Sequence, residues 1–324
     1  MKPFVYCQPD SIEEAGGLLK HSGYSALAGG SDILGEMKDR VVDLHGLVDL
    51  SKIKGLSDVY DAVNDVKIGS MTRLSDLSND PIIQRRCQVL SLAGKAVATE
   101  QIRNIGTVGG NLCQRPRCWY YRNKRFDCLK KGGDICFAVA GMNKYHSIIG
   151  GDRCHIVHPS DVAVALMSLK ASVNLFSDGN IISTPIEEFF VTPDVDITRE
   201  NILRKGEFLT GISIPSSSLD CTGVYLKAKE RQSMDFALVS VAVNIKITDG
   251  VIEDLGVAVG GVSPVPLRLI RLESRLLNTS TKEFKPKDAV VGLFDSAQPM
   301  SQNGYKLPLI ESYVERALIR AIKE

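Results

Sequence analysis

The chain has 324 residues, of which 44% are hydrophobic and 24% are charged, and its formal net charge is +1. This length suits two or three modest domains. The near-neutral charge excludes a global attraction to nucleic acid or acidic membranes, and no apolar run approaches the roughly 18 residues of a membrane span. Because the N-terminus lacks the apolar core of a secretory signal, we expect a cytoplasmic protein with neither nucleic-acid nor membrane partners.

The first part of the chain alternates short predicted helices and strands. Ser11 and Glu14 have the spacing of a capping box and predict a helix that ends at Gly23. Short strands are expected over 25–29, 46–53 and 65–77, with Thr72 as a helix N-cap near the end of the last segment. The pattern from about residue 81 to 99 is helical.

Regular patterns return after residue 155. "HPSDVAVALMSLKA" predicts a helix capped by Ser160 or Asp161, and the C-terminal residues 307–324 predict an amphipathic helix. Two Asp-Gly centres, within 172–184 and 239–261, predict β-hairpins. These patterns indicate an α+β architecture in three pieces, 1–55, 56–215 and 216–324.

Two glycine turns are candidate binding loops. "AGGSDIL" and "TVGGN" each place a glycine pair beside a hydroxyl side chain. Such turns let backbone N–H groups converge on an oxyanion, and two of them suit a diphosphate held from both sides. The alternative for each is an ordinary tight turn. Neither fits the dinucleotide or P-loop patterns.

Five of the eight cysteines lie between Cys113 and Cys154. Isolated cysteines are most often small buried apolar residues, but a cluster is harder to explain in that way. No helical or strand period is sustained from about residue 113 to 155, and loops of that length usually bind a ligand or serve a function. Four thiolates can hold a 4Fe–4S cluster; zinc and reduced spectator thiols are the alternatives.

Five stretches along the chain resemble one protein family: "LAGGSDIL", "QIRNIGTVGGNL", "HPSD", "EFLTGISIP" and "LKAKERQSMDFALVSVAV". Together they resemble the flavin-binding subunit of the molybdenum hydroxylases, which include xanthine dehydrogenase and carbon monoxide dehydrogenase. The resemblance covers essentially the whole chain. It implies an α+β FAD-binding fold like that of vanillyl-alcohol oxidase (the PCMH type), with two subdomains around the flavin and a C-terminal α+β domain.

The resemblance also implies which residues bind FAD. The pyrophosphate would be clasped by two groups of residues, Ala28, Gly29, Gly30, Ser31, Asp32, Ile33 and Leu34, and Thr107, Val108, Gly109, Gly110 and Asn111. Asp161 would hydrogen-bond the cofactor, Leu209 would line the flavin region, and Lys227 would lie near the isoalloxazine. Without the family, Asp161 is better explained as a helix cap and Lys227 as a solvated surface lysine.

The inserted segment departs from the usual family pattern. Typical members separate the "GGN" turn and the "SD" dipeptide by a few residues, whereas about 40 residues are inserted here. Members with such an insertion, the 4-hydroxybenzoyl-CoA reductases and certain bacterial aldehyde oxidoreductases, carry a 4Fe–4S cluster. The aldehyde enzymes have no cysteine at the place of Cys113. This implies the ligands Cys118, Cys128, Cys136 and Cys154, although the sequence leaves the choice between Cys113 and Cys118 open.

By resemblance, the chain is an electron-transfer subunit and the pattern is nearest to 4-hydroxybenzoyl-CoA reductase. Electrons would pass from ferredoxin through the 4Fe–4S cluster and FAD to a 2Fe–2S small subunit and a molybdenum-cofactor large subunit. There the phenolic hydroxyl would be removed reductively to give benzoyl-CoA, in a dimer of heterotrimers. The alternatives are an aldehyde oxidoreductase subunit and a zinc-stabilised assembly module without a cofactor. No residue resembles a substrate acid–base pair.

Basic residues of the insertion are candidates for a ferredoxin docking patch. The alternative is a solvated basic loop. The candidate cations are Arg115, Arg117, Arg122, Lys124, Arg125, Lys130 and Lys131.

Overall fold

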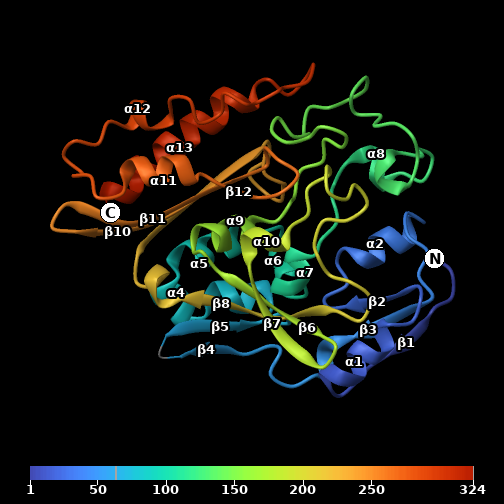
Figure 1. Cartoon of the computed structure of the whole chain (residues 1–324). Coiled ribbons are helices and arrows are strands. Elements are labelled where there is room, and N and C mark those ends of the chain that lie inside the picture. Colours follow the sequence, from blue (N-terminus) through green and yellow to red (C-terminus); the bar gives the residue numbers. More distant parts are fainter. Residues whose placement is uncertain (63, 324) are drawn as a thin grey trace.

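The computed structural model describes residues 1–62 and 64–323, within which the strands form three sheets (Figure 1). The N-terminal unit holds a parallel sheet with the strand order β1-β3-β2. Its elements are β1 (Val5–Cys7), α1 (Ile12–Leu19), β2 (Tyr24–Leu27), α2 (Ile33–Lys38) and β3 (Gly46–Asp49). The predicted cap of α1 is confirmed, because Ser11 accepts a hydrogen bond from the N–H of Glu14.

The second unit contains an antiparallel sheet with the order β4-β5-β8-β6-β7. Its strands are β4 (Val59–Asp61), β5 (Asp65–Gly69), β6 (Ser172–Ser177), β7 (Asn180–Pro185) and β8 (Phe208–Pro215). Its helices are α3 (Leu74–Asn79), α4 (Pro81–Arg86), α5 (Gln88–Ala96), α6 (Glu100–Arg103), α7 (Val108–Leu112), α9 (Asp161–Ser168) and α10 (Ile186–Phe189). Phe176 and Phe208 pack with Leu19 and Val48 into one apolar cluster, which joins this sheet to the N-terminal unit.

The C-terminal unit is an antiparallel sheet with the order β12-β11-β10-β9, covered on both faces. Its elements are β9 (Thr222–Ala228), β10 (Val239–Thr248), β11 (Val251–Gly260), β12 (Leu267–Arg268), α11 (Ile270–Leu276), α12 (Pro286–Val290) and α13 (Lys306–Lys323). Because side chains alternate along a strand, Val241 and Val243 pack in the cluster that contains α13, whereas Ala242 packs in the cluster that contains α9. One face of the sheet is thereby packed against the second unit. The division of the chain at residues 55 and 215 stays a prediction.

Local turn chemistry was predicted better than helix boundaries. Both hairpins form, and the residues of each Asp-Gly turn have positive φ, for example 46° at Asp178 and 84° at Gly179. The prediction that Thr72 caps a helix is wrong, because α3 begins at Leu74 after Arg73. The helix expected over 81–99 is divided at Cys87, which leaves helical geometry with φ −135°.

The inserted segment is irregular, as its lack of a period predicted. Among its described residues, regular structure is limited to α8 (Trp119–Arg122) and a 3₁₀ turn, Leu129–Lys131. In Figure 1 it forms the green region, with α8 close to α2. Over the described residues, no helix has both the length and the apolar character needed to cross a membrane.

Candidate functional site

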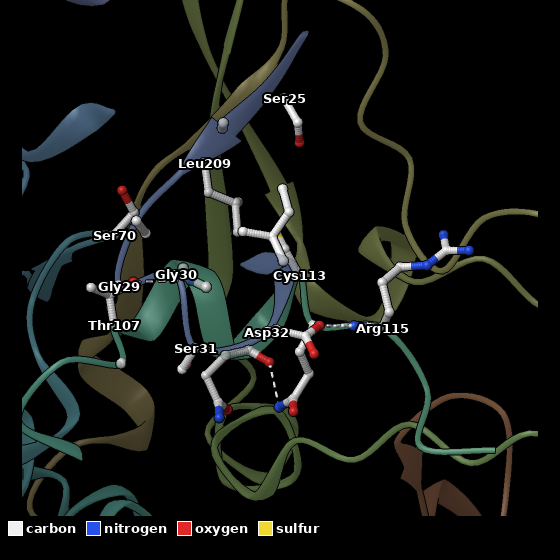
Figure 2. Close-up of a pocket in the computed structure, with 18 of the residues that line it drawn as sticks. Ser25, Gly29, Gly30, Ser31, Asp32, Ser70, Thr107, Cys113, Arg115 and Leu209 are labelled. Atoms are coloured by element: carbon white, nitrogen blue, oxygen red, sulfur yellow. Dashed lines mark hydrogen bonds between the residues drawn. The ribbon is translucent and has the colours of Figure 1, made fainter. Parts of the chain in front are cut away.

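A cavity of about 700 Å³ opens between the N-terminal unit, the second unit and β9, and both glycine turns line it (Figure 2). A Cβ at Gly29 would collide with the carbonyl oxygen of Ile105, and Gly30 has a φ of +70°. Within the described residues, no acceptor is found for the N–H groups of Gly30, Ser31 and Asp32. These donors are therefore available to an anionic group in the cavity.

The second turn differs, because its N–H groups are used within the protein. Val108 donates to the carbonyl of Thr72 at 2.9 Å, and Gly109 donates to that of Ser70 at 2.7 Å. The N–H of Gly110 donates to Thr107 Oγ1 at 3.1 Å. This turn therefore forms a wall of the cavity rather than a second set of free donors.

The cavity contains most of the residues predicted to bind FAD. It is lined by Ala28, Gly29, Gly30, Ser31, Asp32, Ile33, Thr107, Gly109, Gly110, Asn111, Asp161, Leu209 and Lys227. Leu34 and Val108 do not line it: Leu34 packs beside Gly30, and Val108 is 1% exposed in the hydrophobic core. Val108 is taken up by the core because the other face of its turn packs against the protein.

Among the further lining residues are three polar ones that the sequence did not single out, Ser70, Arg204 and Lys205, and Arg117, which was predicted only as a docking residue. The basic pair Arg204–Lys205, two residues before β8, was a usable signal, whereas Ser70 had none. Ser70 Oγ is buried and has no partner among the described residues. A buried hydroxyl without a partner is costly unless a ligand or water satisfies it, so the cavity suits a bound polar cofactor.

A buried acidic group forms one wall of the cavity. Asp161 Oδ2 accepts from Lys227 Nζ at 2.7 Å, and Oδ1 accepts from the Tyr225 hydroxyl at 2.5 Å. Burial raises the pKa of Asp161, although the nearby Lys227 ammonium acts to lower it. Ser160, not Asp161, caps α9, since its hydroxyl accepts from Ala163 N. Lys227 is 5% exposed, so the surface alternative for this lysine is wrong.

Four of the clustered cysteines line a second cavity, of about 20 Å³. They are Cys118, Cys128, Cys136 and Cys154. Cys113 instead lines the larger cavity (Figure 2). All five are free thiols, and His146 Nε2 lies 3.3 Å from Cys118 Sγ. Among the described residues, no group of three His, Cys, Asp or Glu side chains is placed to hold one metal ion.

The cysteine cavity is buried and mostly apolar. Burial raises the pKa of Cys118 to about 11 and that of Cys154 to about 12, so a metal centre must displace protons from these thiols. The four cysteines thus converge on one small cavity, and four thiolates are the ligand set of a 4Fe–4S cluster.

Most of the cations predicted to dock a partner are used inside the protein. Arg117 and Arg122 pair with Asp32, while Arg115 and Lys130 pair with Glu200. Lys131 donates to the backbone carbonyls of residues 120 and 123. Lys124 and Arg125 are exposed, and no partner is found for their side chains among the described residues.

The comparisons with known proteins agree with this site. Residues 2–217 match the model of the FAD binding domain in molybdopterin dehydrogenase, and residues 224–321 match that of the CO dehydrogenase flavoprotein C-terminal domain. The chain belongs to the FAD-binding subunits of the molybdenum hydroxylase family. It is 33% identical to the aldehyde oxidoreductase FAD-binding subunit of Escherichia coli, with 99% of each chain covered.

Other relatives span the whole chain as well. It is 27% identical to the carbon monoxide dehydrogenase medium chain of Hydrogenophaga pseudoflava, covering 97% of this chain and 96% of that one. The solved structure of carbon monoxide dehydrogenase from the same organism superposes with a TM-score of 0.76, at 26% identity and over 99% and 98% of the two chains. The predicted α+β FAD-binding fold with a C-terminal domain is thus confirmed, and the chain is an oxidoreductase subunit.

Proposed function

We propose that this subunit relays electrons between FAD in the large cavity and a 4Fe–4S cluster held by four cysteines, Cys118, Cys128, Cys136 and Cys154. The observation that supports it is the separation of these thiols from Cys113: they line one cavity, while Cys113 lines the other. When bound, FAD exchanges electrons singly or in pairs, and an iron–sulfur cluster exchanges them singly.

The residues of this chain bind and orient the flavin. The free N–H groups of Gly30, Ser31 and Asp32 receive the diphosphate, because the oriented dipoles of a glycine turn attract anions. Lys227 brings a positive charge to the cavity wall, and Asp161 fixes the position of that lysine. In this proposal the residues bind and orient the flavin, and none of them acts as an acid or base on a substrate. The substrate would react on another subunit.

The partners in this proposal are a molybdenum-cofactor large subunit, a 2Fe–2S small subunit and ferredoxin, in a dimer of heterotrimers. An aldehyde is the favoured substrate class, because the relative at 33% identity is a subunit of an aldehyde oxidoreductase. Reduction of 4-hydroxybenzoyl-CoA to benzoyl-CoA is the second candidate, supported by the likeness of the inserted cysteine loop. Assays of the purified complex with an aldehyde plus dye, and with 4-hydroxybenzoyl-CoA plus reduced viologen, separate the two.

The cofactor proposal is tested by analysing iron, acid-labile sulfide, zinc and flavin in anaerobically purified protein. Cys118→Ser is expected to remove about four irons and four sulfides per chain, whereas the matched Cys113→Ser variant keeps them. Comparing the variants cancels the irons of the partner subunit. Flavin with zinc, or flavin without any metal in this chain, overturns the relay; zinc without flavin supports an assembly module.

A further inference from the structure

The Asp32 carboxylate connects the first glycine turn to the inserted segment of residues 113–155, called here the cysteine loop. Asp32 lines the FAD cavity just before α2, but its side chain does not cap that helix. It accepts instead from the Arg115 N–H at 2.7 Å, from Arg117 Nη1 at 2.5 Å and from Arg122 Nη2 at 2.8 Å. Figure 2 shows the bond to Arg115, whose guanidinium points away from Asp32. All three donors belong to the inserted segment.

The same segment is anchored beside the cysteine cavity. Arg117 immediately precedes Cys118, and Arg122 lies on α8, with its N–H donating to the Cys118 carbonyl at 2.9 Å. Tyr121, also on α8, lines the cysteine cavity and donates its hydroxyl to Glu36 of α2 at 2.6 Å. A movement of Cys118 is therefore passed to Arg117, its direct neighbour, and to Arg122, one helical turn away.

The effect of this loop on an anion depends on the balance between the Asp32 carboxylate and the arginines that pair with it. A carboxylate in the loop that receives a diphosphate repels that diphosphate, because like charges at short range disfavour each other. Arg117 and Arg122 bring two positive charges to Asp32, and Arg122 also lies 3.7 Å from the Glu36 carboxylate; the side chains of Arg117, Arg122 and Asp32 are 31%, 16% and 16% exposed. Partial burial limits screening by salt. Loss of the two arginines would leave the Asp32 carboxylate without its counter-charges and make the loop less favourable for an anion.

We propose that Asp32 is a positioning residue that couples the two cofactor sites. With the cysteine loop held by its cluster, Arg117 and Arg122 neutralise Asp32 and FAD binds tightly; with the loop released, the unpaired carboxylate repels the diphosphate. The inference rests on the proposed function, since it needs a cluster at the four cysteines. Because coupling between two sites is reciprocal, bound FAD must also retain the cluster by the same factor.

The test compares the dissociation constant of FAD in cluster-loaded and cluster-free full-length protein. Protein stripped of flavin is titrated with FAD anaerobically, with flavin fluorescence as the readout, and the cluster-free form is made by Cys118→Ser and, separately, by chelation. Loss of the cluster is expected to weaken FAD binding about tenfold. Asp32→Asn is expected to tighten FAD binding in the cluster-free form and to bring the ratio of the two constants to about one.

Two other variants give this test its controls. Asp39→Asn removes an exposed carboxylate at the opposite end of α2 and is expected to keep the wild-type ratio. The double variant Arg117→Gln, Arg122→Gln leaves Asp32 unneutralised, so FAD binding should be weak even in the loaded form. General damage to the fold by Asp32→Asn would weaken FAD binding in both forms and overturn the inference.

If the wild-type chain holds the cluster but its FAD dissociation constant is the same with and without the cluster, the coupling is overturned. The proposed electron relay would still stand. Absence of iron and sulfide from the wild-type chain overturns the proposed function, and the coupling with it. Metal analysis on the same samples distinguishes these two results.

Discussion

Lys227 Nζ lies 2.7 Å from Asp161 Oδ2 at the wall of the large cavity, and both side chains are 5% exposed. The lysine comes from β9 of the C-terminal unit, whereas the aspartate opens α9 of the second unit. Lys227 also donates to the carbonyl of Ala96 at 3.0 Å. The pair therefore joins two units of the chain at the place where the flavin is expected.

Replacing one partner of this pair should destabilise the protein more than replacing both. Lys227→Met leaves the Asp161 carboxylate buried without its counter-charge, which costs about 3 kcal/mol of unfolding free energy. The double variant Asp161→Asn, Lys227→Met should recover part of that loss. Chemical denaturation measures both, with Tyr225→Phe, which removes one hydrogen bond to Asp161, as the milder control. A double variant whose loss equals the sum of the single losses would contradict the expectation.

Lys306 should make stability depend on pH above neutrality. It is 0% exposed, and its Nζ donates to the carbonyls of Tyr145 and Gly261. Burial lowers its pKa from 10.5 to about 7. Between these values the unfolded chain binds the extra proton, so the contribution of Lys306 to stability rises by about 1.4 kcal/mol per pH unit.

Lys306→Met removes this titration. The difference in unfolding free energy between wild type and the variant should grow in favour of wild type from pH 7.5 to 9.5, measured by denaturant titration at each pH. A difference that stays constant over this interval would show that Lys306 titrates normally.

Two glycines close together in sequence should respond oppositely to alanine. A methyl group at Gly29 meets the carbonyl of Ile105, a backbone atom that cannot move alone, so Gly29→Ala should separate the two turns and weaken FAD binding about tenfold or more. Gly35, on α2, has open space around it, and Gly35→Ala should stabilise the protein by about 0.5–1 kcal/mol. Flavin titration and thermal unfolding of both variants check the contrast.

The exposed cations of the cysteine loop should steer an acidic redox partner. Lys124→Glu with Arg125→Glu is expected to slow electron exchange with ferredoxin about tenfold at low salt, and the difference should shrink as salt rises. Dye reduction should be unchanged. The same reversal at Lys285 and Lys287, exposed in the C-terminal unit, is the matched control. Equal ferredoxin rates in the two double variants would remove the docking role.

The local sequence determined the features that depend on neighbouring residues. Asp178–Gly179 makes a hairpin turn because both residues tolerate positive φ, and Ser11 starts a helix because its hydroxyl reaches an N–H three residues later. The same reasoning failed for Thr72, whose Oγ1 has no partner among the described residues. Here long-range packing of the turn against residues 107 and 108 replaced the local cap.

By itself, the sequence identified the two glycine turns and the cysteine-rich insertion, while only the family resemblance pointed to Asp161 and Lys227. Only the tertiary structure decided that Cys113 faces a different cavity from the other four cysteines, and that Arg117 and Arg122 neutralise Asp32 instead of facing solvent. These relationships join residues far apart in the chain. They depend on tertiary packing, because a partly buried charge is stable only beside an opposite charge, and packing decides which residue lies beside it.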